Sequence, residues 1–169
     1  MIEYGKAFKA GILGAFALTL LMYIARAMDV TALNTEMVLG SLLTHKTGAG
    51  SWILGFMLHL VIGGLLAEVY AFAFEFLTER SGMWIGAGFG LVHASFAGMA
   101  MFLLGSIHPL MRNHGVLPAP GPFAINYGAL TAVAFIAVHA VYGAWVGSLY
   151  PARTVAAETD VSEEMPRAA

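Results

Sequence analysis

Four apolar stretches, each long enough to cross the hydrocarbon core of a bilayer, constrain this chain more than any other feature. They lie at residues 8–28, 52–76, 83–105 and 126–150. A transmembrane helix needs about 20 predominantly apolar residues. Only 11% of the 169 residues are charged, against about 25% in soluble domains, so few polar side chains remain to cover a globule. The sequence therefore predicts an all-α integral membrane protein, folded as a four-helix bundle with short loops.

The connections between these stretches refine the prediction. Asn34 is placed to cap a short interfacial helix over residues 35–43, between the first and second spans. The second connection, residues 77–82, is so short that we expect the second and third spans to be antiparallel neighbours. The third, residues 106–125, contains a proline-rich turn and belongs outside the hydrocarbon. Residues 1–150 are thus a single transmembrane domain, and the acidic tail at 151–169 is expected to be disordered.

The first stretch ends in Ala25-Arg26-Ala27, which resembles a signal-peptidase site, but small residues at every fourth position favour a packed helix.

Charge sets the expected orientation and limits the partners. Four Lys or Arg residues flank the spans on the side of the N-terminus and three on the other, which favours a bacterial inner membrane protein with both termini in the cytoplasm. A net charge of −2 predicts no nucleic-acid partner. The expected partners are the lipid bilayer and other membrane subunits or a second copy.

Small residues recur at helical spacing in the last two spans. Such ladders let two membrane helices approach closely. The predicted packing residues are Gly82, Gly86, Gly90 and Gly98 in the third span, and Gly143 and Gly147 in the fourth.

Histidines inside the spans are the strongest functional signal, because the bilayer penalises ionisable groups that do not face protein or water. With a rise of about 1.5 Å per residue, His93 and His139 lie at matched depths, roughly 18 and 20 Å from span ends on the same side. Two imidazoles so placed and flanked by glycines suit axial ligation of a b-type haem. Alternatively, each histidine donates a hydrogen bond to a neighbouring helix, or His59, Glu68, His93 and His139 pass protons or ions.

A second set of histidines is expected at the surface opposite the termini. Imidazole suits copper and zinc, and the chain has no cysteine to supply thiolate ligands. The candidate metal ligands are His59, His108 and His114. No two of them have tight ligand spacing, so ordinary solvated loop histidines are the alternative for His108 and His114.

Four segments resemble an uncharacterised bacterial family of small four-helix membrane proteins, a domain of unknown function. They read MVLGS at 37–41, HLVIG at 59–63, PGPFAINYG at 120–128 and HAVYGA at 139–144. The resemblance extends from about residue 8 to residue 150. It implies the four-helix architecture and no catalytic residue.

Three functions follow from these patterns. The leading prediction is a non-catalytic accessory or scaffold subunit that packs against other membrane helices, in a respiratory or other electron-transfer complex. The second is an electron-transfer subunit that binds haem b or a metal through its intramembrane histidines. The third is a small transporter or channel. The sequence contains no nucleophile elbow, phosphate loop or His-Glu-x-x-His pattern, which argues against an enzyme.

Overall fold

The computed structural model describes residues 2–112, 115–150 and 152. His114 and nearly all of the predicted tail lie outside these residues. The described elements are α1 (Tyr4–Ala27), α2 (Thr35–Thr44), α3 (Ala49–Phe76), α4 (Met83–Ile107), α5 (Pro109–Arg112), the 3-10 helix η1 (Pro122–Tyr127) and α6 (Ala129–Leu149). Within the described part, α1, α3, α4 and α6 are long and apolar enough to cross a membrane. The expected all-α four-helix bundle is confirmed, and the chain is a multi-pass membrane protein.

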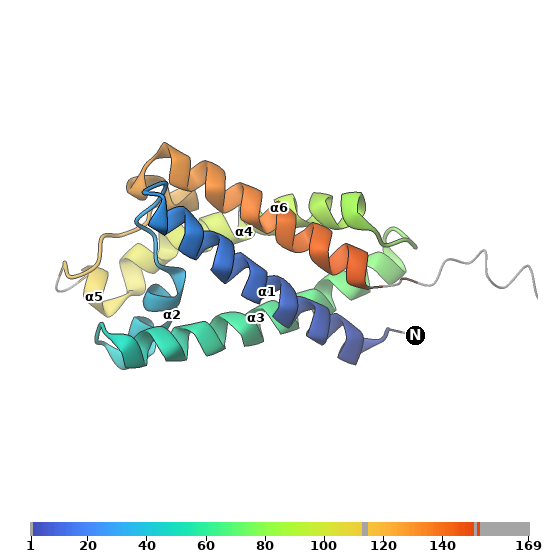
Figure 1. Ribbon diagram of the computed structural model, residues 1–169, viewed down its shortest axis with the longest axis horizontal. Helices are drawn as coiled ribbons and strands as arrows, with labels where there is room; N and C mark the ends of the chain where they lie inside the picture. Colours follow the sequence, from blue (N-terminus) through green and yellow to red (C-terminus); the bar gives the residue numbers. More distant parts are fainter. Residues whose placement is uncertain (1, 113–114, 151, 153–169) are drawn as a thin grey trace, which may run out of the picture.

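The short elements gather at one end of the bundle (Figure 1). There α2, α5 and η1 lie together, whereas the N-terminus, the α3–α4 connection and the end of α6 lie at the other end. The N-terminus and the last described residues are therefore on the same side, as four spans require. Which side faces the cytoplasm stays a prediction.

The short helix α2 forms where the sequence places it. The side chain of Asn34 accepts a hydrogen bond from the backbone N–H of Met37 at 3.0 Å, which caps the first turn. The helix then crosses α3 at close range, because Gly55 has no side chain. A methyl group at that position would overlap the carbonyl oxygen of Glu36. Glycine thus sets the depth at which α2 enters the bundle.

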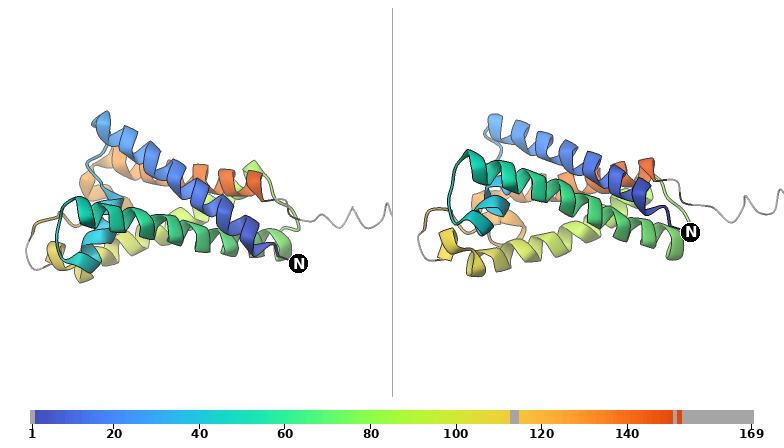
Figure 2. Two further views of the ribbon diagram at one scale, coloured as in Figure 1. Left: turned by 60° about the horizontal axis from the view of Figure 1, so that its bottom comes forward. Right: turned by 90° about the horizontal axis from the view of Figure 1, so that it is seen from below.

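The packing of the long helices corrects one expectation. We expected the spans joined by residues 77–82 to pack as neighbours. Among the four long helices, however, the extensive backbone contacts join α1 to α3, α4 to α6 and α1 to α6, while α3 and α4 meet through side chains. Figure 2 shows α3 and α4 joined at one end and spread apart at the other, with α2 between them. Rings of Phe74 and Phe89, with centroids 5.5 Å apart, meet near the joined end. Bulky rings there and an inserted helix at the far end keep these two backbones apart.

A second correction concerns the start of the last span. We expected it at residue 126, but residues 122–127 form η1 and α6 begins at Ala129. Phe123 and Ala124 both adopt left-handed backbone angles, with φ of 52° and 58°, so a regular α-helix cannot extend from α6 back through these residues. The ring of Phe123 lies against Gly98, where a side chain would overlap it. Gly98 therefore leaves room for the Phe123 ring of this turn instead of contacting another long helix.

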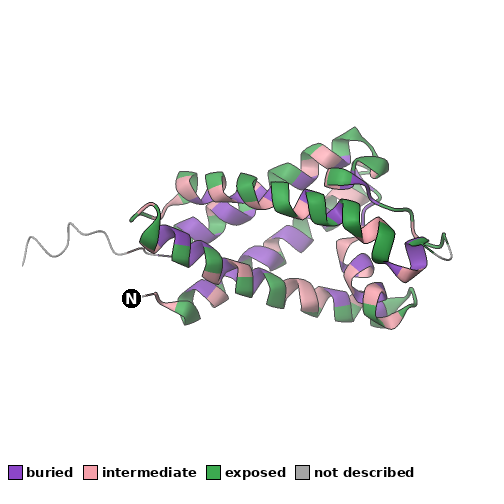
Figure 3. Cartoon of the chain, turned by 180° about the vertical axis from the view of Figure 1, so that it is seen from behind, coloured by how far each residue is buried: buried purple, intermediate pink, exposed green. Residues whose placement is uncertain are grey.

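The remaining ladder glycines lie between α4 and α6. Methyl groups on Gly86 or Gly143 would each overlap the other's carbonyl oxygen, and one on Gly90 would overlap that of His139. Gly147 faces the carbonyl of Gly82, which precedes α4. Outward-facing positions on the long helices are exposed (Figure 3) and carry many large apolar side chains, as a lipid-facing surface requires.

Candidate functional site

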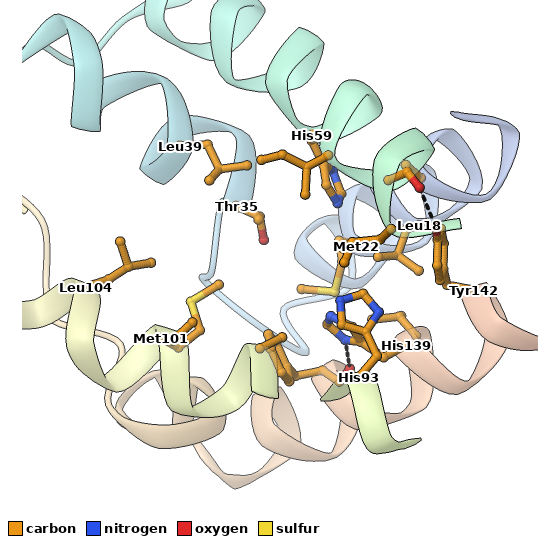
Figure 4. Close-up of a pocket in the computed structure, with 18 residues that line it drawn as sticks. Leu18, Met22, Thr35, Leu39, His59, His93, Met101, Leu104, His139 and Tyr142 are labelled. Atoms are coloured by element: carbon orange, nitrogen blue, oxygen red, sulfur yellow. Dashed lines mark hydrogen bonds between the residues drawn. The ribbon is translucent and has the colours of Figure 1, made fainter. Parts of the chain in front are cut away.

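A cavity of about 280 Å³ lies at the centre of the bundle (Figure 4). Residues from α1, α2, α3, α4 and α6 line it, so all four spans and the short helix contribute. Most of its wall is apolar, with a few polar groups among the aliphatic side chains, two methionines and a phenylalanine. The polar lining residues are Thr35, His59, His93, His139 and Tyr142.

The first pair of histidines comes from α4 and α6. The rings of His93 and His139 meet at right angles with centroids 4.9 Å apart, so the structure brings together the two residues of matched depth. Nδ1 of His139 lies 2.6 Å from the carbonyl oxygen of Phe135, one turn earlier. Nδ1 of His93 lies 3.2 Å from the hydroxyl of Tyr70 on α3. Each ring is therefore held through one nitrogen.

This geometry bears directly on haem. Two imidazoles on opposite faces of one haem iron have ring centres about 6 Å apart, with metal–nitrogen bonds of roughly 2 Å and the macrocycle between them. His93 and His139 instead contact each other edge to face at 4.9 Å. The residues as placed leave no room for a haem between their rings. Haem ligation by this pair stays a prediction that requires the two rings to separate.

His59, the third histidine that lines the cavity, also belongs to a polar cluster outside the cavity wall. Nδ1 of His59 on α3 lies 3.0 Å from the hydroxyl of Thr19 on α1 and 3.7 Å from Oε1 of Glu36 on α2. Arg26, at the end of α1, lies 3.6 Å from the other oxygen of Glu36 and donates to the carbonyl of Leu33. Side chains from α1 and α3 thus surround one carboxyl group on α2.

Glu36 is the most unusual member of this cluster. It is fully buried, and its two oxygens are the only fully buried side-chain polar atoms of the described residues without a hydrogen bond. Burial raises the pKa of the Glu36 carboxyl, but the His59 ring, the backbone of Glu36 and the Thr19 hydroxyl together lower that pKa below its ordinary value. The carboxyl group is therefore ionised at neutral pH. Its charge is balanced by Arg26.

His108 fixes α2 to the end of α4. Its side chain is fully buried. Nδ1 accepts a hydrogen bond from the backbone N–H of Leu110 at 3.2 Å, so Nε2 carries the proton and donates to the carbonyl of Val38 at 3.1 Å. The hydroxyl of Ser41 lies 3.2 Å from the same nitrogen. Both ring nitrogens are engaged within the protein.

The expected metal site gains no support from this arrangement. Within the described residues, no three His, Asp or Glu side chains gather closely enough to hold a metal ion. His59 lines the cavity and His108 lies in the α2 contact, while His114 lies outside the described residues. A metal site formed by these three residues stays a prediction.

A second, lateral hollow of about 250 Å³ lies between α3 and α4. Its lining is almost entirely apolar and comes from these two helices alone. Leu66 and His93 line this groove and also the central cavity. The lateral groove therefore borders the cavity, and these two side chains form part of the wall between them.

Sequence reasoning missed three members of the site. Glu36 and Arg26 are not among the candidate site residues selected from the sequence, although Glu36 precedes Gly40 by one helical turn and so shares the face of α2 that contacts α3. Tyr142 follows His139 by three positions and therefore shares its face. Its hydroxyl donates to the carbonyl of Gly63 at 2.5 Å. Glu68, which was considered for proton or ion passage, is only half-buried and does not line the cavity.

Comparison with known proteins finds no matching family model, no similar curated protein and no similar solved structure. The resemblance to a bacterial family therefore stays a prediction. The part of it that the structure confirms is a small membrane protein with four spans.

Proposed function

We propose that this protein binds a small lipophilic molecule in its central cavity. The observation that carries the proposal is an apolar cavity of about 280 Å³ into which three histidines converge from three helices. Sites for small molecules are concave and mostly apolar, with a few placed polar groups that fix orientation, and they range from about 300 to 1,000 Å³. The cavity is near the lower end of this range, so its ligand is about the size of one or two fused rings.

The polar groups of the wall are available to a ligand. Nε2 of His59, His93 and His139 makes no hydrogen bond within the described part of the chain. None of these three atoms is fully enclosed by protein, since among the described residues the fully buried side-chain atoms without a hydrogen bond belong to Glu36 alone. A polar group that faced this space without a partner would cost free energy. A ligand with complementary groups would remove that cost.

The lateral groove supports access from the bilayer. A molecule dissolved in lipid would reach the groove between α3 and α4 without passing through water. Rotation of the Leu66 and His93 side chains would then open the cavity to it. Rotation of His93 would break its 3.2 Å contact with the Tyr70 hydroxyl. No movement of a helix is required.

Naphthalene provides a direct test, because it is planar, apolar and fluorescent. We expect saturable binding to the protein in lipid nanodiscs, with empty nanodiscs as the blank. Ala97→Phe, which puts a ring into the cavity, should abolish it, since Ala97 lines the wall. The matched control is Ser95→Phe, at an exposed position of the same helix, which should bind as the unmodified protein does. Equal binding by both variants would refute the proposal.

An accessory or scaffold subunit, in a respiratory or other electron-transfer complex, is the second candidate. The exposed apolar side chains of α4, among them Trp84 and Phe96, support it as a surface for partner helices. The ladder glycines face inward, however, so the packing motif that favoured this function is used within the chain. Stoichiometric recovery of other subunits in a mild-detergent pull-down would support the accessory role. A transporter or channel, the third prediction, has no specific observation in its favour.

A further inference from the structure

We infer that the ligand of the central cavity is a hydrogen-bond donor at two points, a lipophilic dihydroxyarene of the hydroquinone type. It would donate to Nε2 of His139 and to Nε2 of His59. This inference rests on the proposed function and names the chemical class that the site selects. It follows from the positions of the protons on the two imidazole rings.

The proton of His139 is fixed by its backbone partner. A carbonyl oxygen only accepts hydrogen bonds, so the nitrogen 2.6 Å from the Phe135 oxygen must carry the hydrogen. That nitrogen is Nδ1. In a neutral imidazole Nε2 is then a bare acceptor. The ring is nine-tenths buried and lines the cavity, so only a donor within the cavity satisfies it.

The proton of His59 is set by Glu36. An ionised carboxylate also only accepts, and Oε1 of Glu36 lies 3.7 Å from Nδ1 of His59. The negative charge favours the tautomer with the N–H on Nδ1, and the hydroxyl of Thr19, 3.0 Å from the same nitrogen, can accept a hydrogen bond from it. A carboxylate beside one imidazole nitrogen orients the ring in this way and makes the other nitrogen more basic. Nε2 of His59 is therefore a second acceptor.

The two acceptors belong to different walls. His59 projects from α3, while His139 projects from α6 beside His93, and the side chain of Met22 lies near both in Figure 4. A molecule lying between them would donate one hydrogen bond to each. Met22, Met101 and Phe135 supply the rest of the contact, and sulfur and aromatic atoms pack well against an aromatic ring. The chemistry of the walls thus favours an arene with two hydroxyl groups.

Acceptors on both walls also discriminate against related molecules. A quinone has only carbonyl oxygens and would leave both imidazole nitrogens unpaired. A dimethyl ether of the hydroquinone has the same rings and no O–H. Because each hydrogen bond changes affinity by about tenfold, the hydroquinone should bind at least tenfold more tightly than either analogue. The simple hydrocarbon should bind like the ether.

The experiment compares four probes on one protein. Naphthohydroquinone under anaerobic conditions, its dimethyl ether, naphthoquinone and naphthalene are titrated against the full chain in nanodiscs, with affinities corrected for partition into empty nanodiscs. We expect the hydroquinone to bind at least tenfold more tightly than the other three. His139→Phe, which retains a ring and removes Nε2, should reduce the hydroquinone-to-ether ratio about tenfold, as should His59→Phe.

Two other outcomes separate this inference from the proposed function. Saturable binding of all four probes with equal affinity would overturn the donor specificity and leave the proposed cavity function standing. Absence of saturable binding by any of them would refute the proposed function itself. Because the first comparison uses unmodified protein, it stays decisive even if the histidine variants fail to fold.

Discussion

Helix α4 packs against α6 on one side and against α3 on the other, and the two contacts are built in opposite ways. Toward α6 it presents glycines, so the two backbones touch along Gly86, Gly90 and Gly143. Toward α3 it presents rings, and Phe89 and His93 meet Tyr70 at centroid distances of 6.2 and 6.0 Å. One side is closed by van der Waals contact between backbones, while the other encloses a cavity with imidazoles in its wall. The comparison shows that the size of facing side chains, rather than the length of the connecting loop, selects the packing partner.

The largest effect should come from breaking the glycine side. Gly143→Leu would drive a side chain into the backbone of α4, and overpacking of this kind costs several kcal/mol because backbone cannot yield. We expect loss of monodisperse protein in size-exclusion chromatography. Gly88→Leu is the matched control, since a side chain at Gly88 meets open space. Normal assembly of Gly143→Leu would show that the two helices do not depend on close approach.

The buried charge cluster should give the next largest effect. Glu36→Gln leaves Arg26 without its counterion, and breaking a buried pair costs about 3 kcal/mol. We expect a lower midpoint of unfolding followed by circular dichroism in detergent. Arg26→Gln and the double variant complete a double-mutant cycle. If the loss of stability in the double variant equalled the sum of the losses in the two single variants, the 3.6 Å contact would contribute nothing to stability.

His108→Ala should loosen α2 rather than the whole bundle. It removes the donor to the Val38 carbonyl and the acceptor for the Leu110 N–H, at a cost of about 2 kcal/mol. Hydrogen exchange of residues 35–44 should increase, with little change in α6. His45→Asn, at the exposed end of α2 where φ is 55°, is the control and should exchange normally, because Asn tolerates this conformation. Unchanged exchange after His108→Ala would mean that glycine contacts alone hold α2.

The smallest effect is expected from Tyr142→Phe. This change removes the hydrogen bond from Tyr142 to the Gly63 carbonyl and retains the ring. Side-chain hydrogen bonds between membrane helices contribute about 0.6 kcal/mol on average, so the unfolding midpoint should barely move. Tyr23→Phe, at an exposed ring, is the reference. A loss as large as that of Glu36→Gln would show that this one hydrogen bond between α6 and α3 stabilises the bundle as strongly as the buried ion pair.

The sequence predicts the contact of α4 with α6 better than it predicts the contact of α4 with α3. The α4–α6 contact follows from glycines spaced one turn apart, and α2 follows from the Asn34 cap. The matched depths of His93 and His139 follow from the helical rise, but their edge-to-face contact depends on rotamers that no spacing specifies. The separation of α3 from α4 depends on the volumes of facing rings and on an inserted helix, which are properties of the assembled bundle. Consecutive left-handed residues at Phe123 and Ala124 also have no signal in a sequence pattern.

The ion pair between the end of α1 and α2 has a consequence for biosynthesis. A carboxylate at the centre of a membrane helix costs about 2.5–3.5 kcal/mol on scales derived from translocon insertion, and Glu36 lies on a helix of only ten residues. The partners that compensate its charge are divided between a segment synthesised earlier, which carries Arg26, and one synthesised later, which carries His59. We therefore expect α2 to remain at the membrane surface until α3 has left the ribosome, and the nascent chain to insert both as one hairpin.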